Sequence, residues 1–138
     1  MLTENDVVSA SCTKLQTLGF EIIQSLDTTK QGIDIIAQKD NLMLYVEAKG
    51  ETSSKEETKR YGKPFSPSQI ESHVSRALLS VSKLLELKQG EAFRVAIALP
   101  DNKGHRKLVK QINYTIEKLE IIMIWVKDAS TVEIENYY

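Results

Sequence analysis

The chain has 138 residues, of which 41% are hydrophobic and 27% charged, and its formal net charge at pH 7 is -1. This is the composition of an ordinary globular protein, and the length predicts a single domain over residues 1–138. The sequence has no run of about 18 apolar residues to span a membrane, and its start lacks the basic and apolar regions of a secretory signal. The only cysteine, Cys12, excludes an internal disulfide framework and a thiolate zinc cluster. We therefore expect a cytoplasmic protein with no membrane partner.

The near-neutral total charge conceals an uneven distribution along the chain. Residues 49–110 hold 13 of the 18 basic side chains, whereas the segments on either side are net acidic. A basic middle segment predicts a positive face, which can attract a polyanion whatever the total charge. The alternative is that these lysines and arginines cluster by chance on a solvated surface.

Helical and strand periodicities alternate along the chain in the order α-β-β-β-α-β-α-β. Helices are predicted from Thr3 to Leu18, from Ser66 to Lys88 after a strong capping motif, and from His105 to Leu119. The polar, charged stretch 50–65 predicts a mobile loop. Strands are predicted over residues 20–25, 33–38, 43–49, 93–99 and 121–126, with a short edge strand over 131–134.

The strand pair around Asp40-Asn41 places two carboxylates opposite each other. If these two residues form a tight turn, Lys39 pairs with Leu42, and Asp34 then lies opposite Glu47. Side chains alternate between the faces of a strand, so Asp34, Glu47 and Lys49 share one face. The other face is apolar and carries Ile33, Ile35, Ala37, Leu44, Val46 and Ala48.

Directly opposed carboxylates destabilise a sheet unless a cation lies between them. Mg²⁺ suits this position because it binds a few carboxylate oxygens and keeps several of its waters. The alternative is a solvent-exposed strand face with ordinary charges, because a slip of one residue in the register would separate Asp34 from Glu47.

Two segments of this hairpin resemble the signature of the PD-(D/E)xK nuclease superfamily. They are Gly32-Ile33-Asp34-Ile35-Ile36-Ala37 and Tyr45-Val46-Glu47-Ala48-Lys49-Gly50, and the helix ending at Leu18-Gly19-Phe20 is similar to that of Mrr-type restriction enzymes and Holliday-junction resolvases. The resemblance covers about residues 5–100. It implies a restriction-endonuclease-like fold of the α/β (α+β) class, with a central mixed β-sheet flanked by helices. It also implies Mg²⁺-dependent hydrolysis of DNA phosphodiester bonds, with Mn²⁺ as a substitute ion.

The resemblance also implies roles for particular residues. Asp34 and Glu47 would ligate the metal, with the Ala48 carbonyl as a further ligand, and Lys49 would position or activate the attacking water. Two departures from the family pattern stand out. Ile33 occupies the place of the proline that gives the motif its name, and Val8 occupies the place of a glutamate in the first helix. Glu4, one turn earlier on that helix, either substitutes for the glutamate or complements the helix dipole.

A second set of polar residues lies at helical spacing in the predicted helix 66–88. Related nucleases often place a polar helical residue beside the catalytic lysine, so Gln69 and His73 are candidates to contact the scissile phosphate, with Arg76 one turn further. The alternatives are a capping role for Gln69 and a half-buried helix-edge position for His73. In the predicted loop, Lys59, Arg60 and Lys63 are expected to grip backbone phosphates, unless the glutamates of that loop leave it a solvated linker. A further basic cluster comprises Lys103, Arg106, Lys107 and Lys110.

Two classes of function are consistent with these sequence features. The first is a metal-dependent endonuclease that acts on DNA in restriction, repair or junction processing, with RNA as an alternative substrate. The second is a catalytically inactive nuclease-fold protein that binds nucleic acid or a protein partner. A protein of this size would need a second copy or a separate targeting subunit to cut both strands of a duplex.

Overall fold

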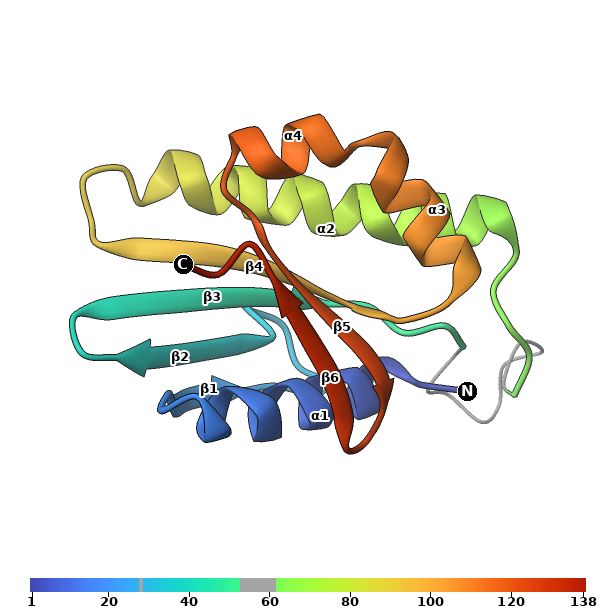
Figure 1. The fold of residues 1–138 in the computed structure, drawn as a ribbon, viewed down its shortest axis with the longest axis horizontal. Coiled ribbons are helices and arrows are strands. Elements are labelled where there is room, and N and C mark those ends of the chain that lie inside the picture. The colour runs from blue at the N-terminus through green and yellow to red at the C-terminus, as the bar shows by residue number, and fades with distance from the viewer. Residues whose placement is uncertain (28, 53–61) are drawn as a thin grey trace.

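The computed structural model describes residues 1–27, 29–52 and 62–138, and its strands form one sheet in the order β1-β2-β3-β4-β5-β6 (Figure 1). Strands β3, β4 and β5 are mutually parallel, and the remaining neighbours pair antiparallel, so the sheet is mixed as predicted. The strands are β1 (Glu21–Ser25), β2 (Ile35–Lys39), β3 (Leu42–Ala48), β4 (Phe93–Pro100), β5 (Ile122–Asp128) and β6 (Thr131–Glu135).

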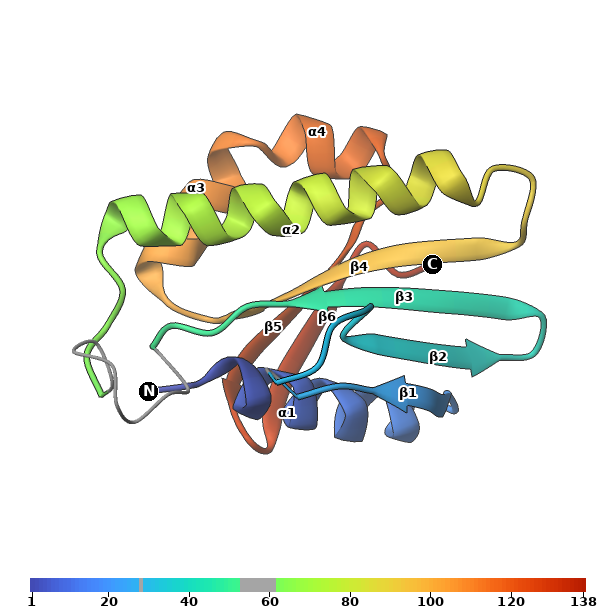
Figure 2. The same cartoon turned by 180° about the vertical axis from the view of Figure 1, so that it is seen from behind.

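Helices cover both faces of the sheet (Figures 1 and 2). One face packs against α1 (Glu4–Thr17), and its buried cluster includes Ile35 and Val46. The other face packs against α2 (Pro67–Leu87), α3 (Lys103–Gln111) and α4 (Asn113–Lys118). One end of the sheet brings together the N-terminus, the end of β3 and the starts of α2 and α3. Within the described residues, no helix is long and apolar enough to cross a membrane.

The register of the β2–β3 hairpin is the predicted one. Lys39 pairs with Leu42, and Asp40 takes a positive φ of 54° in the turn. The predicted apolar face is confirmed for five of its six residues, but the placement of Ile33 is wrong, because Ile33 packs against the cluster on the α2 side. Gly32, with a φ of 135°, redirects the chain just before β2, so the alternation of the strand does not extend back to Ile33.

The first two helices begin at the predicted caps. Thr3 and Ser66 each close a reciprocal capping box, with Asp6 and Gln69 respectively. The third predicted helix is wrong in its bounds, because it begins at Lys103 and breaks at Ile112 into α3 and α4. Ile112 and Asn113 are both weak helix formers, which favours a break at this point. Leu119, the last residue of the predicted helix, lies beyond α4 and is 38% exposed.

The predicted loop 50–65 lies partly outside the described residues. Its two described ends are anchored, because the Glu51 amide donates to the Leu2 carbonyl at 2.8 Å and the Phe65 amide donates to the Glu51 carbonyl at 2.9 Å. The loop therefore leaves and re-enters the fold beside the start of α1.

Candidate active site

Four charged side chains meet where β3 ends. Asp34 precedes β2, Glu47 lies in β3, Lys49 follows β3, and Glu4 is the first residue of α1. One carboxylate oxygen of Asp34 accepts a hydrogen bond from the Ala48 amide at 2.8 Å, and the Asp34 and Glu47 carboxyls are hydrogen-bonded to each other. The Lys49 ammonium lies 3.9 Å from a carboxylate oxygen of Glu4. The structure thus brings together Asp34, Glu47 and Lys49, as the hairpin register predicts, and adds Glu4.

The pKa values of these carboxyls are those of acids crowded in a partly buried site. Burial and then the nearby Asp34 raise the pKa of Glu47 to about 7. Burial also raises the pKa of Asp34, against the lowering effect of the hydrogen bond from Ala48, and burial and Asp34 raise the pKa of Glu4. Lys49 lowers the pKa of all three acids without cancelling these shifts. The metal-free pair of Asp34 and Glu47 therefore retains a proton close to neutral pH.

This donor set fits a hard divalent cation. Two adjacent carboxylates are oxygen ligands of the kind that Mg²⁺ prefers, and a cation would offset the burial and the repulsion that keep a proton on the pair. Among the residues that the structure describes, no group of three or more His, Cys, Asp or Glu side chains is arranged to hold a metal ion. Glu4 therefore stands beside the pair of Asp34 and Glu47 and does not complete a three-carboxylate cluster with them.

Gly50 explains why Glu4 lies in this site. A Cβ atom on Gly50 would lie 2.5 Å from the backbone nitrogen of Glu4 and 2.6 Å from the carbonyl carbon of Thr3. Only a residue without a side chain lets the first turn of α1 approach the end of β3 so closely. The sequence left two roles open for Glu4, as a substitute for the family's glutamate or as a complement to the helix dipole, and the glycine directly after Lys49 is the signal that could have placed Glu4 near the site.

The predicted residues of α2 lie along its first turns. The side-chain oxygen Oε1 of Gln69 accepts from the Ser66 amide at 2.8 Å, so Gln69 does cap the helix. His73 is half-buried, and its ring centroid lies 4.6 Å from that of Phe65. Burial lowers the pKa of His73, and the positive charges of Lys49 and Arg76 lower it further. His73 is therefore a neutral imidazole within electrostatic reach of Lys49.

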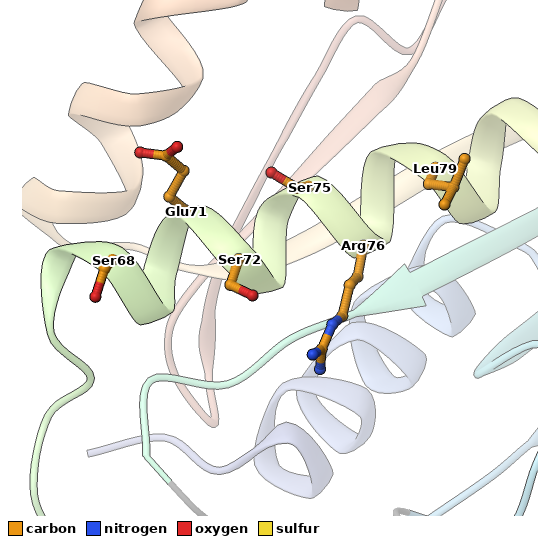
Figure 3. A pocket seen from close by; sticks show the side chains of 6 residues that line it. All are labelled: Ser68, Glu71, Ser72, Ser75, Arg76 and Leu79. Atoms are coloured by element: carbon orange, nitrogen blue, oxygen red, sulfur yellow. The ribbon is translucent and has the colours of Figure 1, made fainter.

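The other predicted nucleic-acid contacts are exposed or lie outside the described residues. Lys63 and Arg76 are exposed, whereas Lys59 and Arg60 fall in the part of the chain that the structure does not describe and stay predictions. Arg76 extends from the side of α2 opposite to Glu71 (Figure 3). A shallow hollow on the outer surface of α2 is lined by Ser68, Glu71, Ser72, Ser75, Arg76 and Leu79.

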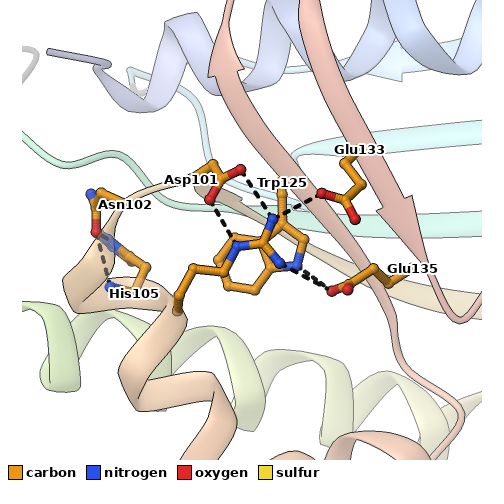
Figure 4. A network of polar contacts seen from close by, with 7 residues as sticks. Asp101, Asn102, His105, Trp125, Glu133 and Glu135 are labelled. Atoms are coloured by element: carbon orange, nitrogen blue, oxygen red, sulfur yellow. Dashed lines mark hydrogen bonds and ion pairs between the residues drawn. The ribbon is translucent and has the colours of Figure 1, made fainter.

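The predicted basic cluster at the start of α3 is wrong for Arg106, because acids are paired with its guanidinium. Figure 4 shows these acids, Asp101, Glu133 and Glu135, around the Trp125 ring. The Arg106 guanidinium donates to both carboxylate oxygens of Asp101, at 2.7 and 3.0 Å, and contacts Glu133 at 3.0 Å and Glu135 at 3.5 Å. It also lies 4.0 Å from the centre of the Trp125 ring. Three acids therefore neutralise Arg106. Lys103, Lys107 and Lys110 remain exposed at helical spacing, and we call these three residues the α3 lysine stripe.

Comparisons with known proteins support the fold. No protein-family model and no curated protein matches the chain. The crystal structure of an XisH family protein from Nostoc punctiforme matches it with a TM-score of 0.52 and 16% sequence identity, over 94% of this chain and 98% of that chain. The two chains share a fold. A six-stranded mixed sheet flanked by helices is consistent with the predicted restriction-endonuclease-like fold.

Proposed function

We propose that this protein is a metal-dependent endonuclease that hydrolyses phosphodiester bonds in DNA. The observation that carries the proposal is the meeting of Asp34, Glu47 and Lys49 at the end of β3. The similar XisH family structure, whose family has a PD-(D/E)xK-like fold, supports the same assignment at the level of the fold. Asp34, Glu47 and the Ala48 carbonyl would hold Mg²⁺, with Mn²⁺ as a substitute. When bound, the ion supplies Lewis acidity, which lowers the barrier to attack on an anionic phosphodiester.

The residues around the pair would bind and orient the substrate. Lys49 brings a positive charge next to the carboxylates, where it can orient the attacking water and offset the negative charge that develops on the phosphoryl oxygens. The Glu4 carboxylate lies 3.9 Å from the Lys49 ammonium, where its charge can attract it. His73 and the amide nitrogen of Gln69 can donate hydrogen bonds to a phosphate from the α2 side.

We expect Mn²⁺ to bind wild-type protein and to bind Asp34→Ala at least about tenfold more weakly, because the substitution removes one of two carboxylate ligands. Isothermal titration calorimetry measures this, and near pH 7 binding should release the proton that Glu47 holds. The matched control is Asp27→Ala, which removes an exposed acid from the segment that precedes Asp34. Equal affinities for wild type and Asp34→Ala would contradict the metal site.

One observation favours the alternative of a nuclease-fold protein without catalysis. Within the described residues, the site lacks a third acid arranged to hold metal together with Asp34 and Glu47. A cleavage assay with Mg²⁺ or Mn²⁺ on duplex, single-stranded and branched DNA, and on RNA, separates the two functions. Binding without cleavage of any of these would favour the alternative, and cleavage of both duplex strands would call for a second copy or a targeting subunit.

The α3 lysine stripe is one exposed part of the predicted basic face, and it makes no ion pair with another residue that the structure describes. We expect the triple substitution of Lys103, Lys107 and Lys110 by alanine to weaken DNA binding equally for unrelated sequences. It should also reduce the slope of log affinity against log salt by about 0.9 for each lost phosphate contact. A triple alanine variant of Lys14, Lys118 and Lys127 has the same change of charge elsewhere on the molecule and is the control. An unchanged salt slope in the stripe variant would show that the stripe is only a solvated surface.

A further inference from the structure

Glu51 connects two segments of the chain through its side chain. One carboxylate oxygen accepts from the Leu2 amide at 3.0 Å, and the other accepts from the Asn102 side-chain amide at 3.3 Å. These bonds join the segment before α1 to the segment before α3. The carboxylate thus lies between these two segments, at the end of the sheet where the candidate active site lies.

Glu51 and Leu2 are joined by two reciprocal hydrogen bonds. The Glu51 amide donates to the Leu2 carbonyl at 2.8 Å while the Leu2 amide donates to the Glu51 carboxylate, so both backbone polar groups of Leu2 are satisfied by one residue. Two residues further on, Glu4 begins α1, with its backbone against Gly50. The direction in which Glu4 enters the site therefore depends on where Glu51 holds Leu2.

The bond to Asn102 gives Glu51 a fixed support. Asn102 caps α3 through its side-chain oxygen, which accepts from the His105 amide at 2.9 Å and contacts His105 Nδ1 at 2.9 Å. His105 is fully buried. Because Asn102 is held by its capping role, its amide group presents a donor to Glu51 from a position that the core fixes.

We propose that Glu51 is a positioning residue that holds Glu4 beside Lys49 and the Asp34–Glu47 pair. The inference rests on the proposed function, because it assigns Glu51 to the support of the same metal site. Glu51 acts through the start of α1, since its two carboxylate oxygens bond Leu2 and Asn102. Glutamine in its place keeps the size of the side chain but has only one oxygen, so it cannot accept both bonds.

A double-mutant cycle tests this coupling through the affinity for Mn²⁺, measured by calorimetry on the whole chain. The variants are Glu51→Gln, Glu4→Gln and the double variant, with Glu71→Gln on exposed α2 as the matched control. We expect Glu51→Gln to lose about tenfold in affinity when Glu4 is present, because displacing Glu4 moves its negative charge away from the ligands Asp34 and Glu47. In the Glu4→Gln background the further loss should be below about twofold. An equal loss in both backgrounds would overturn the proposal, because loss of charge or general loosening acts without Glu4.

A second measurement tests the positioning role of Glu51 independently of the proposed metal site. In the metal-free protein, nuclear Overhauser contacts between the side chains of Glu4 and Lys49 should be present in wild type and Glu71→Gln and be lost or weakened in Glu51→Gln. If wild-type protein binds no Mn²⁺, the metal site fails, whereas loss of these contacts still supports Glu51 as the residue that positions Glu4. Unchanged contacts in Glu51→Gln overturn the proposal whatever the metal affinity.

Discussion

Lys49→Ala should lower the rate of DNA cleavage by at least about a hundredfold while metal binding persists. Lys49 contributes the positive charge beside Asp34, Glu47 and Glu4, and its loss removes the group that would orient water and stabilise the charge developing on the phosphate. Its positive charge also opposes a second cation in the site. The alanine variant should therefore bind Mn²⁺ as tightly as wild type, or more tightly.

Single-turnover cleavage, DNA binding and Mn²⁺ calorimetry on the same preparations separate a chemical role of Lys49 from a structural one. Lys118→Ala removes an exposed lysine from the end of α4, and this control should cleave at the wild-type rate. Cleavage by Lys49→Ala at the wild-type rate would show that another residue performs this role. Loss of Mn²⁺ binding together with cleavage would show that Lys49 supports the site as a whole.

The parts of the site that depend on nearby residues could be predicted from the sequence. The turn at Asp40-Asn41 determines the register of β2 and β3, and that register alone predicts Asp34 and Glu47 as neighbours. The capping motif at Ser66 likewise fixes the start of α2, and with it the place of Gln69 and His73. In both cases the information lies within a few residues of the feature that it determines.

The remaining features depend on contacts between residues far apart in the sequence. Glu4 reaches the site because Gly50 admits the backbone of α1 and Glu51 binds Leu2, which no periodicity in the first helix can reveal. Arg106 reads as part of a basic cluster until β6 brings Glu133 and Glu135 against it. Charge patterns along a sequence therefore identify candidate surfaces, whereas the fold decides which of those charges are already neutralised.

The Glu47→Gln variant should be more stable than wild type at pH 8 without metal, by about 2–3 kcal/mol after the full shift is discounted for the partial exposure of Glu47, and equally stable near pH 4. Glu47 has a pKa of about 7 in the folded protein against 4.5 as an ordinary side chain. The folded state thus keeps a proton that the unfolded state has released, so wild-type stability falls as pH rises from about 4.5 to about 7. Glutamine cannot ionise, and it keeps a neutral hydrogen-bonding group beside Asp34. The variant therefore avoids this loss.

Urea unfolding of both proteins across this pH range measures the difference directly. His105 acts in the opposite direction, because burial lowers its pKa to about 4 and stability then rises with pH between about 4 and 6.5. This contribution is common to both proteins and cancels in the difference between them. Saturating Mn²⁺ at pH 8 should stabilise wild type, because it binds only the folded state, and should stabilise Glu47→Gln far less. The difference in free energy of unfolding between the two proteins should therefore shrink or change sign. Parallel profiles of stability against pH for the two proteins would show that Glu47 is an ordinary carboxylate. A wild-type stability that does not change with Mn²⁺ would contradict the proposed metal site.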